Sequence, residues 1–152
     1  MPDRSTVGDA LSALVIQIFR LNGTLAKIGD ELAQPAGQST ARWQVLAAAE
    51  HAPVTVAQIA KALELTRQSV QRVANVLVTE GLGTFQANPR DKRADLFILS
   101  DTGRAALREI QTRQRAWANA LGAEIGEAEL AQTLALLERM MERVVDSSAR
   151  AS

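Results

Sequence analysis

Residues 82–99 interrupt a sequence that is otherwise patterned for helices. Thr84–Gln86 and Leu96–Leu99 are short runs rich in the β-branched and aromatic residues that favour strands. Between the two runs, residues 88–93 read Asn-Pro-Arg-Asp-Lys-Arg, a turn sequence with three positive charges. We therefore expect one β-hairpin with a basic tip, and this restricts the fold to mostly helical classes that carry a small hairpin.

Two short helices are predicted immediately before the hairpin. Thr55–Gln58 matches the capping box, in which the Thr and Gln side chains each satisfy a backbone N–H at the start of a helix. Glu64 lies in the turn that follows, and Thr66 can cap a second helix that runs to about Glu80, where Gly81 ends it. Two helices, a tight turn and a hairpin are the order of a winged helix-turn-helix lobe.

Longer helical patterns flank this lobe. Apolar residues recur at three- and four-residue steps over Val7–Ala33 and Glu127–Asp146, and both segments are predicted to be amphipathic helices. Thr40–His51, with His51 as its last residue, is predicted to be a further helix. Ser100 can cap a helix that runs toward Leu121 and is broken by residues 122–126, and residues 147–152 are expected to fray.

The apolar rows of the first and last helices exceed what one small winged lobe can bury. We therefore expect a single domain, residues 1–152, with the winged helix-turn-helix lobe at 40–101 and dimerisation helices at 7–33 and 101–146. The predicted fold class is mostly α with a small β-hairpin. The rows that we expect to pair in a homodimer are Leu11, Leu14 and Ile18 in the first helix and Leu134, Leu137 and Met141 in the last.

Composition excludes several classes of function. The 152 residues include no cysteine and one histidine, which argues against disulfides, thiol chemistry and zinc sites built on sulfur or histidine. We find no glycine-rich phosphate loop and no Ser/His/Asp set, so we expect neither an enzyme nor a cofactor or metal. No apolar run approaches the ~18 residues of a membrane span, and the start does not resemble a signal peptide. We expect a cytoplasmic protein with no membrane partner.

Charge and polarity point to nucleic acid. The net charge is zero, but the basic excess lies in the middle of the chain, where residues 61–104 hold seven Lys/Arg and five Asp/Glu. A helix fits the major groove, Gln can pair with adenine, and Arg can pair with guanine or phosphate. A basic hairpin tip can enter the minor groove or meet phosphate. The candidate DNA contacts are Thr66, Arg67, Gln68, Ser69, Gln71, Arg72, Arg90, Lys92 and Arg93, and Asn75 shares the face of Gln68 and Gln71.

This pattern resembles the MarR (multiple antibiotic resistance regulator) family of bacterial transcription factors. Residues 89–94 (PRDKRA) followed by 99–103 (LSDTG) resemble the family's wing signature, Asp-x-Arg and then Leu-(Thr/Ser)-x-x-Gly. The resemblance implies that Arg93 lies in the minor groove and that Asp91 orients the wing. The sequence departs from the family at Glu64, where glycine is common, and at Gly83 and Phe85, where an aliphatic residue and an arginine are usual.

Two-fold pairing of the apolar rows would set two recognition helices about one DNA turn apart, ~34 Å, so we expect a homodimer that binds a near-palindromic site in double-stranded DNA. The resemblance covers essentially the whole chain. It also implies repression relieved by a small aromatic or amphipathic ligand, for which Phe19 and Trp43 are candidate pocket residues; Trp43 is otherwise a core anchor. The alternative is a winged helix used as a protein-interaction module without DNA binding. That alternative predicts exposed apolar side chains in place of Gln68, Gln71 and Arg72. A second alternative pairs Arg72 with a surface carboxylate.

Overall fold

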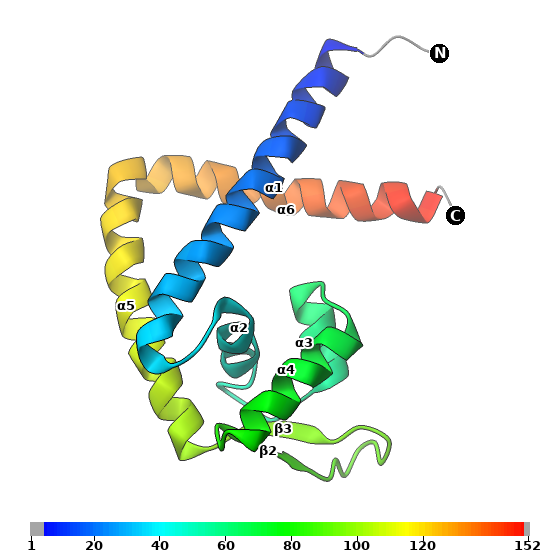
Figure 1. Cartoon of the computed structure of the whole chain (residues 1–152). Helices are drawn as coiled ribbons and strands as arrows, with labels where there is room; N and C mark the ends of the chain where they lie inside the picture. The colour runs from blue at the N-terminus through cyan, green and yellow to red at the C-terminus, as the bar shows by residue number, and fades with distance from the viewer. Residues whose placement is uncertain (1–4, 151–152) are drawn as a thin grey trace. The chain divides into compact units, whose positions relative to one another are not determined.

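The computed structural model describes residues 5–150, and the chain divides into two compact units, residues 1–111 and 112–152. The first unit contains helix α1 (Thr6–Ala33), the 3₁₀ turn η1 (Gln34–Ala36), helices α2 (Thr40–Ala48), α3 (Val56–Leu63) and α4 (Arg67–Thr79), and strands β1 (Val54–Thr55), β2 (Gly83–Gln86) and β3 (Leu96–Leu99). Helix α5 (Asp101–Ile125) begins in the first unit and ends in the second, where α6 (Glu127–Arg150) follows it (Figure 1). The predicted mostly helical class with a small hairpin is confirmed.

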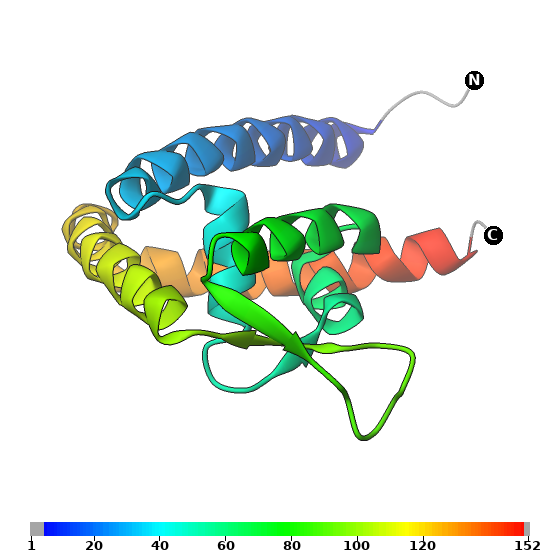
Figure 2. The same ribbon diagram turned by 60° about the horizontal axis from the view of Figure 1, so that its bottom comes forward.

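A small antiparallel sheet supports the hairpin. Its strand order is β1-β3-β2, with Phe85 opposite Phe97 across β2 and β3, and Val54 opposite Phe97 across β1 and β3. The hairpin was expected, whereas β1 was not, because two residues are too few to show the alternation that marks a strand. Figure 2 shows the loop between β2 and β3 extending beyond the helices as a wing.

The core of the first unit lies where α2, α3 and α4 pack together with the sheet and the start of α5. Burying a Leu, Ile or Phe side chain contributes roughly 1.5–3 kcal/mol, so this cluster fixes the orientation of α4. The largest fully buried side chains within it are Val45, Leu46, Ile59, Val70, Leu77, Phe97 and Leu107.

Side-chain caps set the helix starts in the first unit. The capping box predicted before α3 is confirmed: the Gln58 backbone N–H donates to Thr55 Oγ1 at 3.1 Å, and the Thr55 N–H donates to Gln58 Oε1 at 2.9 Å. Thr66 caps α4 by accepting from the Ser69 N–H at 3.1 Å. Each cap satisfies backbone donors that the first helical turn leaves unpaired, which contributes ~1 kcal/mol.

Three predicted helix ends are wrong. Helix α2 stops at Ala48 because the Ala49 and Glu50 N–H groups bond to carbonyls three residues back, so His51 is a 90% exposed loop residue. Helix α5 continues through Gly122 to Ile125, since an interior glycine costs only ~1 kcal/mol, and Gly126 ends it with φ +101°. Helix α6 reaches Arg150, so residues 147–150 are helical, and the rest of the predicted frayed tail lies outside the described residues.

The second unit has no buried residue among its described residues, 112–150. Its end of α5 and the whole of α6 nevertheless carry large apolar side chains at helical spacing. An amphipathic helix must bury its apolar stripe against another surface to be stable. These helices therefore need a partner surface; the exposed side chains are Leu121, Ile125, Leu130, Leu134, Leu136, Leu137, Met141, Val144 and Val145.

Helix α1 is joined to the lobe near its C-terminal end, where the Thr40 backbone N–H donates to Asp30 Oδ1 and the Thr40 hydroxyl donates to the Ala26 carbonyl, both at 2.7 Å. Its buried residues are Gly29 and Ala33. By length and composition, residues 6–36 could cross a membrane, with a mean hydropathy of 1.2 in the most apolar window. A helix that packs against a protein partner has the same length and composition, so this one helix does not by itself indicate a membrane.

Candidate nucleic-acid interface

Helix α4 presents a polar face because its opposite side is anchored in the core. Val70, Ala74 and Leu77 are buried at successive turns of the helix, which fixes its rotation about its own axis. The first turn is fixed as well, since the Ser69 hydroxyl donates to the Thr66 carbonyl at 2.9 Å. The exposed side chains of α4 include no acidic group; they are Arg67, Gln68, Gln71, Arg72, Asn75, Val76 and Thr79.

The side chains of this face differ in how they are held. The Gln71 amide nitrogen donates to Asn75 Oδ1 at 2.9 Å, one turn further along α4. Within residues 5–150, neither Gln68 nor Arg72 has a side-chain hydrogen bond or an ion pair. The ion pair between Arg72 and a surface carboxylate, which was the second alternative, is therefore absent from these residues. Gln68, Gln71 and Arg72 are exposed where the protein-interaction alternative requires apolar side chains, although Val76, further along α4, is exposed as well.

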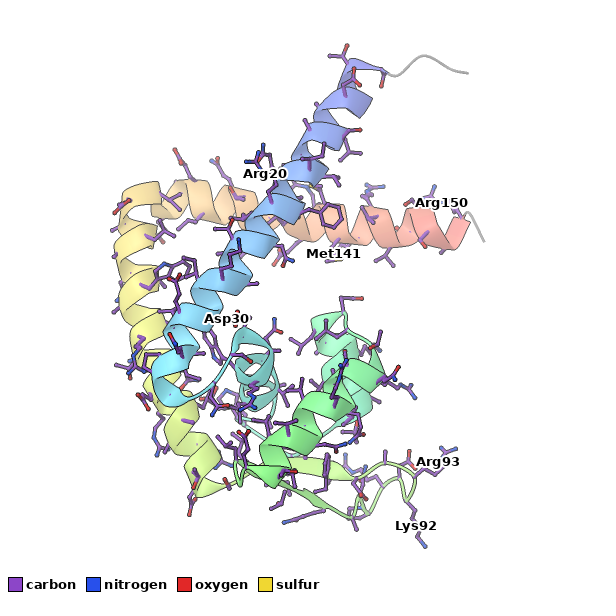
Figure 3. The ribbon with its side chains drawn as sticks, in the orientation of Figure 1. Arg20, Asp30, Lys92, Arg93, Met141 and Arg150 are labelled. Atoms are coloured by element: carbon purple, nitrogen blue, oxygen red, sulfur yellow. The ribbon has the colours of Figure 1, made fainter. Side chains whose placement is uncertain are left out.

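Two side chains, the carboxamide of Asn88 and the carboxylate of Asp91, organise the wing tip. Asp91 Oδ1 accepts from the Arg93 backbone N–H at 3.0 Å and from Arg93 Nε at 3.2 Å. Asn88 Oδ1 accepts from the Arg90 backbone N–H at 3.0 Å, which tightens the first half of the loop. The Arg93 side chain is 92% exposed, and Figure 3 shows Lys92 and Arg93 extending from the tip in different directions. The loop thus presents positive charges to solvent, and the Arg93 side chain among them is held by Asp91.

Helix α4, the start of α3 and the wing enclose a groove of about 640 Å³. It brings Arg67, Gln68 and Gln71 together with Lys92 and Arg93, which are more than twenty residues away in the sequence. Arg72 and Arg90 do not line it. The complete lining is Val56, Ala57, Arg67, Gln68, Gln71, Asn75, Phe85, Lys92, Arg93, Ala94 and Asp95. The groove therefore joins most of the predicted contacts into one concave surface that is rich in hydrogen-bond donors.

The departures from the family pattern at Gly83 and Phe85 explain each other. The half-buried Phe85 ring meets the fully buried Phe97 ring edge-on, with centroids 5.8 Å apart and an interplanar angle of 64°. A side chain on Gly83 would collide with the Phe97 ring. Gly83 thus leaves room for the Phe97 ring, and Phe85, two residues further along β2 and opposite Phe97, packs against that ring. Such aromatic pairs contribute ~0.5–1.5 kcal/mol beyond burial and hold the base of the wing.

A second anchor lies where the wing returns to α5. The Ser100 hydroxyl donates to the Gly81 carbonyl at 2.7 Å and accepts from the Gly103 N–H at 3.0 Å, as expected of a cap. The Ser100 N–H also donates to the Leu82 carbonyl at 3.1 Å. A Cβ at Gly103 would overlap that carbonyl oxygen. The Leu-Ser-x-x-Gly motif is therefore the corner that fixes the hairpin against α5.

Several residues at this surface escaped sequence reasoning. The groove is also lined by Val56, Ala57, Ala94 and Asp95. No sequence pattern marks these four residues, and their role at the surface follows only from their positions in the folded chain. The two candidate ligand residues lie in different surroundings: Phe19 lies on α1 and is 72% exposed, whereas Trp43 on α2 packs against the core. Thr66 and Ser69 use their hydroxyls in the α4 cap.

Two short helices in sequence, an exposed polar second helix and a basic hairpin beside it define a winged helix-turn-helix protein. The MarR family model matches residues 37–94, from the segment before α2 to the wing tip. The chain belongs to the MarR family. It is 37% identical over 135 residues to the uncharacterized proteins Rv2011c from Mycobacterium tuberculosis and Mb2034c from Mycobacterium bovis, covering 89% of this chain and 94% of each relative.

Solved structures share the fold. A MarR family transcription regulator, SP03579, superposes with a TM-score of 0.81 at 18% identity, covering 92% of this chain and 93% of that chain. A mutant MarR from E. coli complexed with operator DNA gives 0.78 at 22% identity, covering 90% and 99%. The M. tuberculosis regulator MosR in complex with DNA gives 0.70 at 22% identity, covering 86% and 96%. This chain has the fold of MarR family transcription regulators.

Proposed function

We propose that this protein is a transcription regulator that binds specific double-stranded DNA as a homodimer. The observation that carries the proposal is the groove that α4 and the wing form together, with the amides of Gln68 and Gln71 on one wall and the charges of Lys92 and Arg93 on the other. Two structural neighbours with this fold are complexed with DNA, which supports the same use of the fold here.

In this proposal each wall meets a different part of the duplex. Helix α4 enters the major groove, where Gln68 and Gln71 contact base edges and Arg67 and Arg72 contact base or phosphate. The wing places Arg93 in the adjacent minor groove, with Arg90 and Lys92 against phosphates. The concave surface between the two walls accommodates the phosphate backbone that separates a major groove from a minor groove. Thr66 and Ser69 hold the first turn of α4 against that backbone.

Homodimerisation supplies the partner surface that the exposed apolar rows require. The row on α1 includes Leu11 and Leu14, and the row on α6 includes Leu134, Leu137 and Met141, all exposed in the single chain. A two-fold dimer places two copies of α4 about one DNA turn apart, ~34 Å, and so requires a near-palindromic site. The same pairing accounts for the apolar character of α1 without a membrane, and we propose a cytoplasmic location.

The sign of regulation and the response to a ligand rest on family membership. We infer that the dimer represses transcription and releases DNA when a small aromatic or amphipathic molecule binds near Phe19 and Trp43. The protein-interaction alternative lacks its expected feature, since the exposed face of α4 carries amides and guanidinium groups where that alternative requires apolar side chains.

A salt-dependent gel shift tests the proposal. The full chain is titrated into duplex DNA from the region upstream of its own gene, with an unrelated duplex of equal length as the control. We expect a discrete complex that survives competition by the unrelated duplex and that weakens as salt rises, since phosphate contacts release counterions. Absence of binding at low salt would refute the proposal and favour the protein-interaction alternative.

A further inference from the structure

The hydrogen bond between Gln71 and Asn75 distinguishes two glutamines that are otherwise alike. Gln68 and Gln71 are one turn apart on α4, both are exposed, and both line the groove. Of the two, only Gln71 has a side-chain partner within residues 5–150: its amide nitrogen donates to Asn75 Oδ1 at 2.9 Å. Residues four apart on a helix face each other, so Asn75 can hold this amide without any change in the backbone.

The donor inventory leaves Gln71 free to contact a base while it is held. An amide nitrogen carries two hydrogens and an amide oxygen carries two lone pairs. One hydrogen goes to Asn75 Oδ1, so one N–H and the whole Gln71 oxygen remain available. Paired contact with adenine in the major groove needs one N–H donor, toward N7, and one acceptor, for N6. The pair is therefore compatible with adenine recognition, and the amide plane of Gln71 is partly fixed before DNA arrives.

We propose that Asn75 is a positioning residue that orients the Gln71 amide for an adenine and thereby sharpens base preference at one position of each half-site. This inference rests on the proposed function. Gln68 lacks such a partner and has to be ordered when it binds, so it discriminates less strongly at its own position. Immobilising a flexible side chain weakens binding by about threefold to tenfold, and a side chain that is already ordered avoids most of this loss.

The test compares base preference at the two positions with matched variants. The full chain and the variants Asn75→Ala, Gln71→Ala, Gln68→Ala and the double variant Gln71→Ala/Asn75→Ala are titrated against a selected site and its single-base substitutions. We expect Asn75→Ala to reduce the preference for adenine at the Gln71 position by about threefold to tenfold, while the Gln68 position is unchanged. Asn75→Ala should have no further effect when Gln71 is already Ala. Thermal melting confirms that each variant is folded.

Asn75→Asp separates positioning from direct contact. The aspartate keeps an acceptor oxygen for the Gln71 N–H, so the adenine preference should persist even though the added negative charge weakens binding to all sequences. An equal loss from Asn75→Ala in the presence and absence of Gln71 would show that Asn75 contacts DNA itself and would overturn the inference. Full preference in Asn75→Ala would overturn it too. Both results leave the proposed function standing, whereas failure of the unaltered chain to bind any duplex would overturn both.

Discussion

The wing makes a prediction whose sign distinguishes orientation from charge. Arg93 is 92% exposed at the loop tip, and its ordered contacts in the described chain are the two hydrogen bonds to Asp91. Arg93→Ala should therefore leave the free energy of unfolding within ~0.5 kcal/mol of its original value. Loss of a charged hydrogen-bonded contact costs ~1.5–3 kcal/mol, so two wings in a dimer should weaken DNA binding by ~3–6 kcal/mol, or ~100-fold to 10⁴-fold.

Asp91→Ala is the decisive partner of that variant. Coulomb's law alone predicts tighter binding, because the substitution removes a negative charge near a polyanion. The structure predicts weaker binding, because Asp91 Oδ1 holds both the backbone N–H and the Nε of Arg93. An Arg93 without this brace has to be ordered by the DNA. Asp91→Asn serves as the control: it keeps an acceptor for the backbone N–H, so its affinity should lie between those of the original chain and Asp91→Ala.

A salt series of DNA affinity, measured by fluorescence anisotropy, checks both substitutions. The slope of log affinity against log salt changes by about 0.9 for each lost phosphate-like contact, so Arg93→Ala should flatten it by roughly two units per dimer. Asp91→Ala should lower affinity with a smaller change of slope, since Arg93 is still present. If Asp91→Ala tightens binding at every salt concentration, Asp91 is only a solvated charge and the orientation argument is refuted.

Further substitutions test the fold and the dimer. Gly103→Ala should lower the free energy of unfolding by about 2–3 kcal/mol in urea titration, because its Cβ would overlap the Leu82 carbonyl, whereas Gly23→Ala meets open space inside α1 and should raise it by up to ~1 kcal/mol. Glu64→Gly should raise it by ~0.5–1 kcal/mol, since Glu64 has φ +53°; a loss would mean that its side chain stabilises the turn. Leu134→Glu should convert a dimer of twice 16.3 kDa into monomers by light scattering, while Gln132→Glu on the opposite face of α6 should not, and a monomeric original chain would contradict the pairing.

Sequence reasoning succeeded where a local physical signal exists. The Thr55/Gln58 capping box, the Thr66 and Ser100 caps and the closing Gly81 each depend on neighbours within four residues, and all of them were predictable. Sequence reasoning failed where the end of a helix depends on a balance of free energies that the residue pattern does not show. Gly122 did not break α5, because a single interior glycine costs less than the surrounding helix gains.

The candidate site shows the same division. That Gln68, Gln71 and Asn75 share a face follows from helical spacing, and the basic tip follows from its residues. The groove that joins α4 to the wing depends on the packing of Phe85 against Phe97 and on the Gly103 corner, which are contacts between segments distant in sequence. The hydrogen bond that distinguishes Gln71 from Gln68 was equally invisible, since both glutamines have suitable neighbours in the sequence.

Selection of bound sequences from random duplex DNA tests the central claim most directly. The full chain is mixed with a random library at moderate salt, and bound duplexes are recovered and sequenced over several rounds. We predict enrichment of a near-palindromic site whose half-sites are centred about one helical turn apart, with adenine at the positions under α4 and A·T-rich flanks where the wing reaches the minor groove. Recovery of duplexes with no common sequence, or of none above background, would contradict the account.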